Sequence, residues 1–279
     1  FAISGNNTDG NKYIYDAIDN GARIIVSSLK LRGFNKNKVL FIQNKNPRKL
    51  LSYISSKFYK LKPNNIIAVT GTNGKTSVAN FYQQILSLNH KNVASIGTLG
   101  VLSRKFNLKT NNTTIDSVSI HKILEKLKKL KIDNVIIEAS SHGLKQHRLN
   151  NIQFNTALFT NLSRDHLDYH KTIIDYFNSK LVLFDELVNF KGNIIFDEKI
   201  KQSRKLKIIS KKRKLNKFTL GSPRAFIRIT NIQRFSDYNK IDCVINKKNY
   251  SFKTSLIGKI QIKNFIFAII AAYLSKLNM

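Results

Sequence analysis

Cysteine is nearly absent from this 279-residue sequence, in which Cys243 is the only one. A single cysteine excludes an internal disulfide and any zinc site built from several cysteines. Long apolar runs are also missing: none reaches the roughly 18 residues that span a membrane, and segment 266–274 is interrupted and too short. No basic segment precedes an apolar one at the N-terminus, so we expect no signal peptide. These absences favour a reducing cytoplasm and no insertion into a membrane.

Acidic residues are scarce, because 16 Asp and Glu stand against 48 Lys and Arg and leave a net charge of +32. Such a charge is typical of proteins that bind nucleic acid or an anionic membrane surface. Lys is spread along the chain beside abundant Asn and Ile, however, as an AT-rich coding sequence produces without any partner. The dense run 205–217 contains the pair Ile208-Ile209 and predicts a short strand followed by a solvated basic loop. We therefore expect no nucleic-acid partner, although a basic surface also suits an anionic substrate.

Apolar strands alternate with amphipathic helices through the middle of the chain. This alternation predicts an α/β fold, with a mainly parallel sheet that helices cover on both faces. Beyond residue 206 the pattern changes to short strands, which predict a small antiparallel sheet before a final helix. The predicted strands are 66–70, 93–96, 135–138, 157–160, 193–196, 225–232, 241–245 and 250–256, and the predicted helices are 77–88, 118–129, 173–184 and 263–277.

The turn sequence at 63–65, Pro-Asn-Asn, is the best candidate for a domain boundary. We expect residues 1–62 to form a partial α/β domain and residues 63–279 to form a central domain. In the first part the pattern predicts strands at 1–3, 22–27 and 39–42 and helices at 13–19 and 50–58. The chain starts without Met inside a predicted strand and ends just after an apolar helix, so we expect an incomplete chain.

A glycine-rich turn follows the predicted strand 66–70 and leads into a helix. Its glycines let the backbone approach phosphates, and the helix N-terminus adds positive potential. Lys75 is expected to reach the β- and γ-phosphates of ATP, and the Thr76 hydroxyl to bind Mg²⁺. The spacing is the short G-x-x-G-K-T, since Val69 stands where the longer motif has its first glycine. A chance glycine turn is disfavoured because strand, loop and helix agree. The loop consists of Gly71, Thr72, Asn73, Gly74, Lys75, Thr76 and Ser77.

Two further polar loops follow predicted strands. Glu138 ends the apolar strand 135–138, where phosphate-loop proteins place a magnesium ligand, and the segment 138–148 adds hydroxyls, two histidines and an arginine. The segment 161–170 holds further Asp, Arg and His side chains after the next strand. Because open α/β sheets bind ligands at the carboxyl ends of their strands, we expect both loops to lie beside the phosphate loop.

Five segments together closely resemble the Mur ligases, and within them the MurE type, which adds the third residue of the peptidoglycan stem peptide. The phosphate loop is shared with folylpolyglutamate synthases, whereas the two polar loops are more selective. The segments are TGTNGKTS (70–77), NNTT (111–114), EASSHGLKQHR (138–148), TNLSRDHLDYH (160–170) and Ser179-Lys180-Leu181.

The resemblance implies ATP-dependent peptide-bond formation on a UDP-linked muropeptide in the bacterial cytoplasm, by a monomer. The D-glutamyl carboxylate attacks the γ-phosphate of ATP to give an acyl phosphate. The amine of a diamino acid, meso-diaminopimelate or L-lysine, then displaces phosphate. Clustered positive charge must neutralise the transferring phosphoryl group, and the resemblance assigns this task to Lys75 and two Mg²⁺ ions.

Site residues are carried over from the same resemblance. Thr76 and Glu138 match ligands of the first metal ion and His166 a ligand of the second. Lys180 matches a lysine that carbon dioxide carbamylates, which turns a cation into a carboxylate-like metal ligand. Positions that contact the UDP-sugar-peptide correspond to Asn112, Thr113, Thr114, Ser140, Gln146 and Arg148, and the uridine nucleotide falls near Asn6, Asn7 and Thr8.

Some features depart from the family pattern. From the resemblance we expect the first stretch of the uridine-binding domain and the whole C-terminal, amino-acid-binding domain to lie outside this chain, and segment 256–264 has Ile260-Gln261 where the family has Phe-Asn. Three alternatives therefore stay open. They are another ligase of the superfamily such as folylpolyglutamate synthase, a nucleotide-binding remnant without catalysis, and a phosphate-loop protein that binds nucleic acid.

Overall fold

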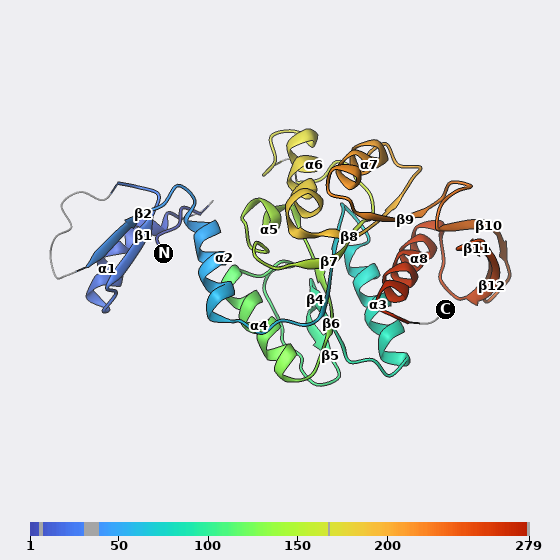
Figure 1. Cartoon of the computed structure of the whole chain (residues 1–279), viewed down its shortest axis with the longest axis horizontal. Coiled ribbons are helices and arrows are strands. Elements are labelled where there is room, and N and C mark those ends of the chain that lie inside the picture. Colours follow the sequence, from blue (N-terminus) through green and yellow to red (C-terminus); the bar gives the residue numbers. More distant parts are fainter. Residues whose placement is uncertain (6–7, 31–38, 167, 278–279) are drawn as a thin grey trace.

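The computed structural model describes residues 1–5, 8–30, 39–166 and 168–277, and most of them surround one ten-stranded sheet (Figure 1). The strand order is β12-β11-β10-β9-β8-β7-β3-β6-β4-β5, and the central pairs from β4 to β10 are parallel. The strands are β3 (Asn65–Thr70), β4 (Val93–Gly97), β5 (Gly100–Ser103), β6 (Asn134–Glu138), β7 (Phe154–Phe159), β8 (Val188–Asp197), β9 (Asn216–Leu220), β10 (Ile227–Arg234), β11 (Asn239–Ile245) and β12 (Lys248–Thr254).

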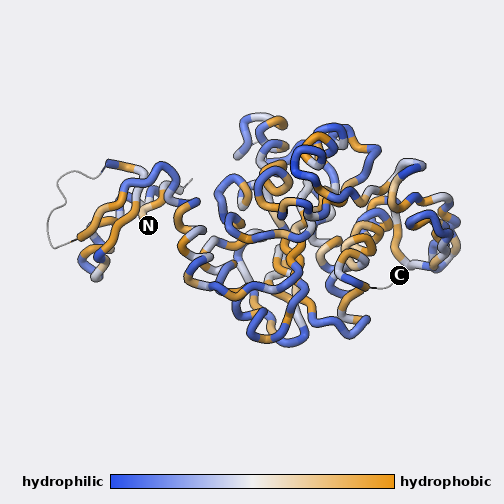
Figure 2. The backbone as a smooth tube through the Cα atoms, viewed as in Figure 1, coloured by the Kyte–Doolittle hydropathy of each residue, from blue (hydrophilic) through white to orange (hydrophobic). Residues whose placement is uncertain are grey.

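Helices cover both faces of this sheet, as expected for parallel strands that are apolar on both sides. Along β3, Ile66 and Ala68 join the core beneath α4 (Ser117–Lys129), α5 (Ser141–Lys145), α6 (Ile173–Val182) and α7 (Ser203–Lys212). Ile67 and Val69 face the opposite core, which α3 (Lys75–Leu88) and α8 (Lys259–Leu274) complete. In Figure 2 the apolar colour accordingly runs through the central strands and α8. In the described part of the chain, no helix combines the length and apolarity that a membrane crossing requires.

The last three strands pair antiparallel, as predicted, and form one end of the ten-stranded sheet. A single residue pair, Ile227 with Leu220, joins them to β9 in parallel. The inner face of β11 carries Ile241, Cys243 and Ile245, which pack in the same core as α8. This end of the sheet therefore supports the helix that lies beside α3.

The first residues form a second, two-stranded parallel sheet of β1 (Ile24–Ser27) and β2 (Leu40–Gln43). A short 3₁₀ segment (Gly10–Tyr13) and α1 (Ile14–Asp19) pack on it around Ile14 and Ile25. Helix α2 (Pro47–Phe58) follows and contacts α4, and its Ser52 hydroxyl donates to the carbonyl of Asn150 at 2.6 Å. The predicted strand 1–3 is reduced to one bridge between Ala2 and Ser27.

The prediction of a strand at Ile208-Ile209 was wrong, because residues 203–212 form α7. The buried positions Leu206, Ile209 and Ser210 recur at the spacing of a helix, which the apolar pair alone concealed. Two short strands, β5 and β9, and the five-residue helix α5 were not predicted. Helix α6 ends at Val182 and continues as a π-helical turn over Leu183–Leu187.

Candidate functional site

The phosphate loop connects β3 to α3 at the carboxyl end of the sheet. Gly71 and Gly74 have φ angles of +143° and +87°, which side chains other than hydrogen rarely allow. A methyl group on Gly71 would lie 1.9 Å from Thr160 Oγ1, and one on Gly74 would lie 2.6 Å from Asn264 Oδ1. No side chain caps the N-terminus of α3, so its N–H groups remain available to an anion.

Lys75 is the first residue of α3 and folds back over the loop. Its Nζ donates to the carbonyl oxygen of Gly71 at 3.0 Å and to that of Thr72 at 2.7 Å. Burial lowers the pKa of Lys75, and the nearby carboxylates of Glu138 and Asp165 oppose that shift. The ammonium group is thus held inside the loop where a phosphate would lie.

Glu138 stands at the end of β6 and is almost fully buried. Its Oε2 accepts hydrogen bonds from the hydroxyls of Thr76 at 2.8 Å and Thr98 at 3.2 Å, and its Oε1 accepts from the Thr98 amide at 3.0 Å. Gly97 leaves the room this carboxylate needs, since a methyl group there would lie 2.0 Å from Glu138 Oε1. The fold therefore fixes a carboxylate against the hydroxyl of the phosphate loop.

Lys180 lies on α6 and is completely buried. Its Nζ donates to the Gly71 carbonyl at 3.0 Å and sits 4.2 Å from the centre of the Tyr176 ring. Burial and then the nearby charge of Lys75 lower the pKa of Lys180 to about 7, against the attraction of Asp165. The amine of Lys180 therefore loses its proton at a lower pH than an exposed lysine does.

A cluster of rings surrounds His142 of α5. The ring of His142 lies 5.0 Å from His166, 4.0 Å from Tyr169 and 5.7 Å from His170. Burial lowers the pKa of His142, and the neighbouring imidazoles lower it further. The φ angle of His166 is 51°, in the left-handed region. The two polar loops expected at one edge of the sheet therefore do meet there.

Arg148 follows α5 and is held by its neighbours. Its guanidinium donates to the Thr114 carbonyl at 2.5 Å and to Gln146 Oε1 at 2.7 Å. The Thr114 hydroxyl in turn accepts from the Ser140 amide at 2.9 Å and donates to the Glu138 carbonyl at 2.7 Å. Burial lowers the pKa of Arg148. This network links the predicted substrate-contacting residues to the strand that carries the carboxylate.

These elements enclose a cavity of about 240 Å³. Thr113, Ser140, His166 and Lys180 line it beside the phosphate loop, so the structure brings most of the predicted site together. The full lining is Thr72, Asn73, Gly74, Lys75, Thr76, Ser77, Thr98, Thr113, Ser140, Ser141, His166, Tyr176 and Lys180.

Other predicted residues lie outside this lining. Asn112 is exposed on the preceding loop, and Thr8 is exposed in the N-terminal segment, where its carbonyl accepts from Gly5. Asn6 and Asn7 fall outside the described residues. The structure therefore leaves the predicted uridine contacts as a prediction.

Among the predicted metal ligands, only Glu138 and His166 belong to the residue types that most often bind metal ions. Within the described residues, no three His, Cys, Asp or Glu side chains converge. The bonded pair of Thr76 hydroxyl and Glu138 carboxylate nevertheless supplies the hard oxygen atoms that Mg²⁺ prefers. Lys180 offers an amine, which would become an oxygen ligand only on carbamylation. With a carbamate at Lys180, this set of oxygen donors fits Mg²⁺.

Three residues at the site had not been predicted as functional. Thr98 holds the carboxylate of Glu138, Tyr176 donates from its hydroxyl to Thr72 Oγ1 at 3.3 Å, and Asn264 packs against Gly74. Thr98 comes directly after β4, so the rule about strand ends could have found it. The positions of Tyr176 and Asn264 depend on how two helices dock against the loop.

The fold and this site define a phosphate-loop nucleotide-binding α/β protein. A family model described as Mur ligase middle domain matches residues 69–272, and the chain therefore belongs to the Mur ligase family. The sequence is 37% identical to the UDP-N-acetylmuramoyl-L-alanyl-D-glutamate--2,6-diaminopimelate ligase of Rickettsia montanensis over 98% of this chain. The chain spans 57% of the length of that relative.

Solved structures agree with this assignment. The structure of a UDP-N-acetylmuramoyl-L-alanyl-D-glutamate--2,6-diaminopimelate ligase matches with a TM-score of 0.84 and 25% identity, over 96% of this chain and 55% of that one. The MurF ligase from Thermotoga maritima in complex with ADP has a TM-score of 0.63 at 15% identity, over 100% and 60% of the two chains, and so shares the fold.

Proposed function

We propose that this chain provides the ATP-binding part of a ligase that adds a diamino acid to UDP-N-acetylmuramoyl-L-alanyl-D-glutamate. The observation that carries the proposal is the position of Lys180, a buried amine with a pKa near 7 that is bonded to the phosphate loop. The similarity to 2,6-diaminopimelate ligases supports it, and makes diaminopimelate the first amino acid to test and L-lysine the comparison.

In this proposal the phosphate loop and Lys75 hold the triphosphate of ATP. The loop carbonyls of Gly71 and Thr72 orient the ammonium group of Lys75 before ATP binds, so little reorganisation is needed. Its charge offsets the negative charge of the γ-phosphoryl group while the D-glutamyl carboxylate attacks it. The products of that step are ADP and an acyl phosphate, which the amine of the diamino acid then converts to an amide with release of phosphate.

Thr76, Glu138 and His166 are proposed to hold Mg²⁺. When bound, Mg²⁺ supplies positive charge that the phosphate oxygens require. The hydrogen bonds from Thr98 keep the Glu138 carboxylate in place, and its burial makes it depend on such donors.

Lys180 is proposed to react with carbon dioxide. Its neutral amine forms a bond to the carbon atom, one proton is released, and a carbamate with one negative charge results. The buried position fits this reaction because desolvation disfavours the ammonium form. The carbamate would add a further oxygen ligand for metal to the cavity that His166 also lines.

The substrate is proposed to extend from the cavity, which Thr113 and Ser140 line, across the network of Thr114, Gln146 and Arg148, with Asn112 at its border. A guanidinium group suits the pyrophosphate or carboxylates of a UDP-muropeptide. We further propose that residues 1–62 belong to a separate UDP-binding domain, with Thr8 near the nucleotide, and that residues 63–279 form the ATP-binding domain.

Phosphate release tests the proposal. The protein produced from its own gene should release phosphate from ATP only when UDP-N-acetylmuramoyl-L-alanyl-D-glutamate and the diamino acid are both present. Phosphate release that does not depend on the muropeptide would refute the ligase assignment. Activity with a folate and glutamate instead would assign the protein to the other branch of the superfamily.

A further inference from the structure

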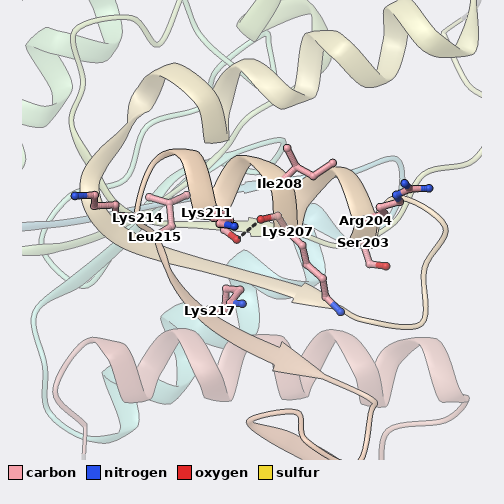
Figure 3. Close-up of a pocket in the computed structure, with 9 residues that line it drawn as sticks. Ser203, Arg204, Lys207, Ile208, Lys211, Lys214, Leu215 and Lys217 are labelled. Atoms are coloured by element: carbon pink, nitrogen blue, oxygen red, sulfur yellow. Dashed lines mark hydrogen bonds between the residues drawn. The ribbon is translucent and has the colours of Figure 1, made fainter.

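A second hollow, of about 730 Å³, lies along α7 and shares no lining residue with the phosphate-loop cavity (Figure 3). Five of its lining side chains are cations, namely Arg204, Lys207, Lys211, Lys214 and Lys217. The hollow is therefore a basic surface that the ligase site does not use.

The exposed face of α7 is built around one apolar side chain. Ile208 is 55% exposed, whereas Leu206 and Ile209 on the other side of the helix are buried in the core. Positions that are three and four residues apart share a helix face. By this spacing Ile208 is framed on its own face by Arg204 and Lys211.

The cations of this hollow are poorly matched by acids. Lys207 has one acidic partner, Glu198 Oε1, at 3.4 Å. Within the ranges that the structure describes, the side chains of Arg204, Lys211 and Lys217 have no ion pair. Unpaired charges of one sign repel each other, and an anionic partner with several negative groups would relieve that repulsion.

We propose that this face of α7 is a peripheral binding surface for an anionic lipid bilayer. A surface helix that presents an apolar side chain between lysines can bury that side chain at the level of the headgroups, while the ammonium groups pair with lipid phosphates. The lining contains no aromatic side chain, whereas single-stranded nucleic acid is usually bound by stacking on aromatic rings. These features favour a bilayer over nucleic acid.

The test is co-sedimentation of the full chain with vesicles of phosphatidylglycerol and phosphatidylcholine, compared with phosphatidylcholine alone. The triple variant Lys211→Gln, Lys214→Gln, Lys217→Gln should bind the anionic vesicles about a hundredfold more weakly, because each basic residue near such a surface contributes about fivefold. A matched variant, Lys60→Gln, Lys91→Gln, Lys248→Gln, removes the same charge from exposed positions elsewhere and should change binding less than about threefold.

The apolar contribution is tested separately. Ile208→Ser should weaken binding to anionic vesicles by about fivefold without any change in charge. Ile257→Ser, at a side chain that is 87% exposed elsewhere, should leave binding unchanged. Circular dichroism should show all variants folded, since they change exposed side chains.

Three results would overturn the proposal. An equal loss in the two triple variants would show diffuse attraction by net charge. Equal binding to neutral vesicles would exclude recognition of anionic lipid. A nucleic-acid site would be identified instead by two results together. The protein would bind polyuridylate tightly and lose this binding in the variant Lys211→Gln, Lys214→Gln, Lys217→Gln, and Ile208→Ser would have no effect on binding to vesicles.

Discussion

The ε-amino nitrogen of Lys180 donates a hydrogen bond to the carbonyl oxygen of Gly71 at 3.0 Å. These residues are 109 positions apart in the chain, so the bond fastens α6 to the phosphate loop. The same carbonyl accepts from Lys75 Nζ at 3.0 Å, which places two lysines against one oxygen. Burying an amine beside another cation is unfavourable for the charged form. The fold therefore accepts a loss of stability at the position of this buried amine.

Carbamate formation at Lys180 should follow the lowered pKa. With ¹³C-labelled bicarbonate at a constant total concentration, the carbamate signal in NMR should grow between about pH 6 and 8 and change little above, because the falling concentration of dissolved carbon dioxide then offsets the release of a proton and the neutral fraction of the amine is saturated. Lys180→Arg should abolish the signal. A signal that keeps rising steeply through pH 10 would be typical of an ordinary lysine and would contradict the assignment.

Replacement of Lys180 by Met should stabilise the protein in a way that depends on pH. The pKa of Lys180 is lower in the folded than in the unfolded state. The loss of stability caused by burying its charged amine is therefore complete below about pH 7 and decreases as pH rises toward 10.5. Without bicarbonate, the gain in unfolding free energy should be about 3–5 kcal/mol at pH 6 and about 2 kcal/mol smaller at pH 9. Urea unfolding of both proteins measures it, and Lys171→Met, at an exposed position, is the control.

Lys75→Ala should remove the charge that binds the phosphates of ATP. Hydrogen bonds to charged groups contribute about 1.5–3 kcal/mol, so ATP affinity should fall at least about tenfold and turnover should be lost. Calorimetric titration with ATP measures the affinity, with the exposed Lys91→Ala as the comparison. Unchanged affinity and turnover would show that the phosphate loop is wrongly assigned.

Gly97→Ala should displace the carboxylate of Glu138 without changing any residue of the phosphate loop. The added methyl group would lie 2.0 Å from Glu138 Oε1, and the buried carboxylate must move away from Thr76 and Thr98. Binding of ATP in EDTA should stay nearly the same, whereas the gain in affinity on adding Mg²⁺ should be lost. A full magnesium effect in this variant would place the metal ion elsewhere.

The helical conformation of α7 predicts that substitutions of two adjacent isoleucines change the unfolding free energy by different amounts. Ile209 is 6% exposed and packs in the core, so Ile209→Ala should lower the unfolding free energy by about 2–4 kcal/mol. Ile208 is 55% exposed, and Ile208→Ala should change it by less than about 1 kcal/mol. Thermal and urea unfolding measure both. Similar losses in the two variants would contradict the assigned helix face.

Several features of this protein were determined by the local sequence. The glycines of the phosphate loop, the Lys-Thr pair and the flanking strand and helix all lie within residues 65–88, so their geometry depends on backbone preferences and short contacts. Glu138 could be placed beside that loop because parallel strands end at one edge of the sheet. The alternation of apolar strands and amphipathic helices likewise predicted the layered fold.

Other features were decided only by the tertiary structure. The burial of Lys180, the hydrogen bonds from Thr98 to Glu138 and the packing of Asn264 against Gly74 join segments that are far apart in the chain. The conformation of the run 205–217 also depended on tertiary structure. An adjacent pair of isoleucines fits either a strand or a helix, and only packing against the core shows which of the two side chains is buried. Local sequence determines which conformations are allowed, whereas the pKa of a lysine depends on the charges and solvent that the whole fold places around it.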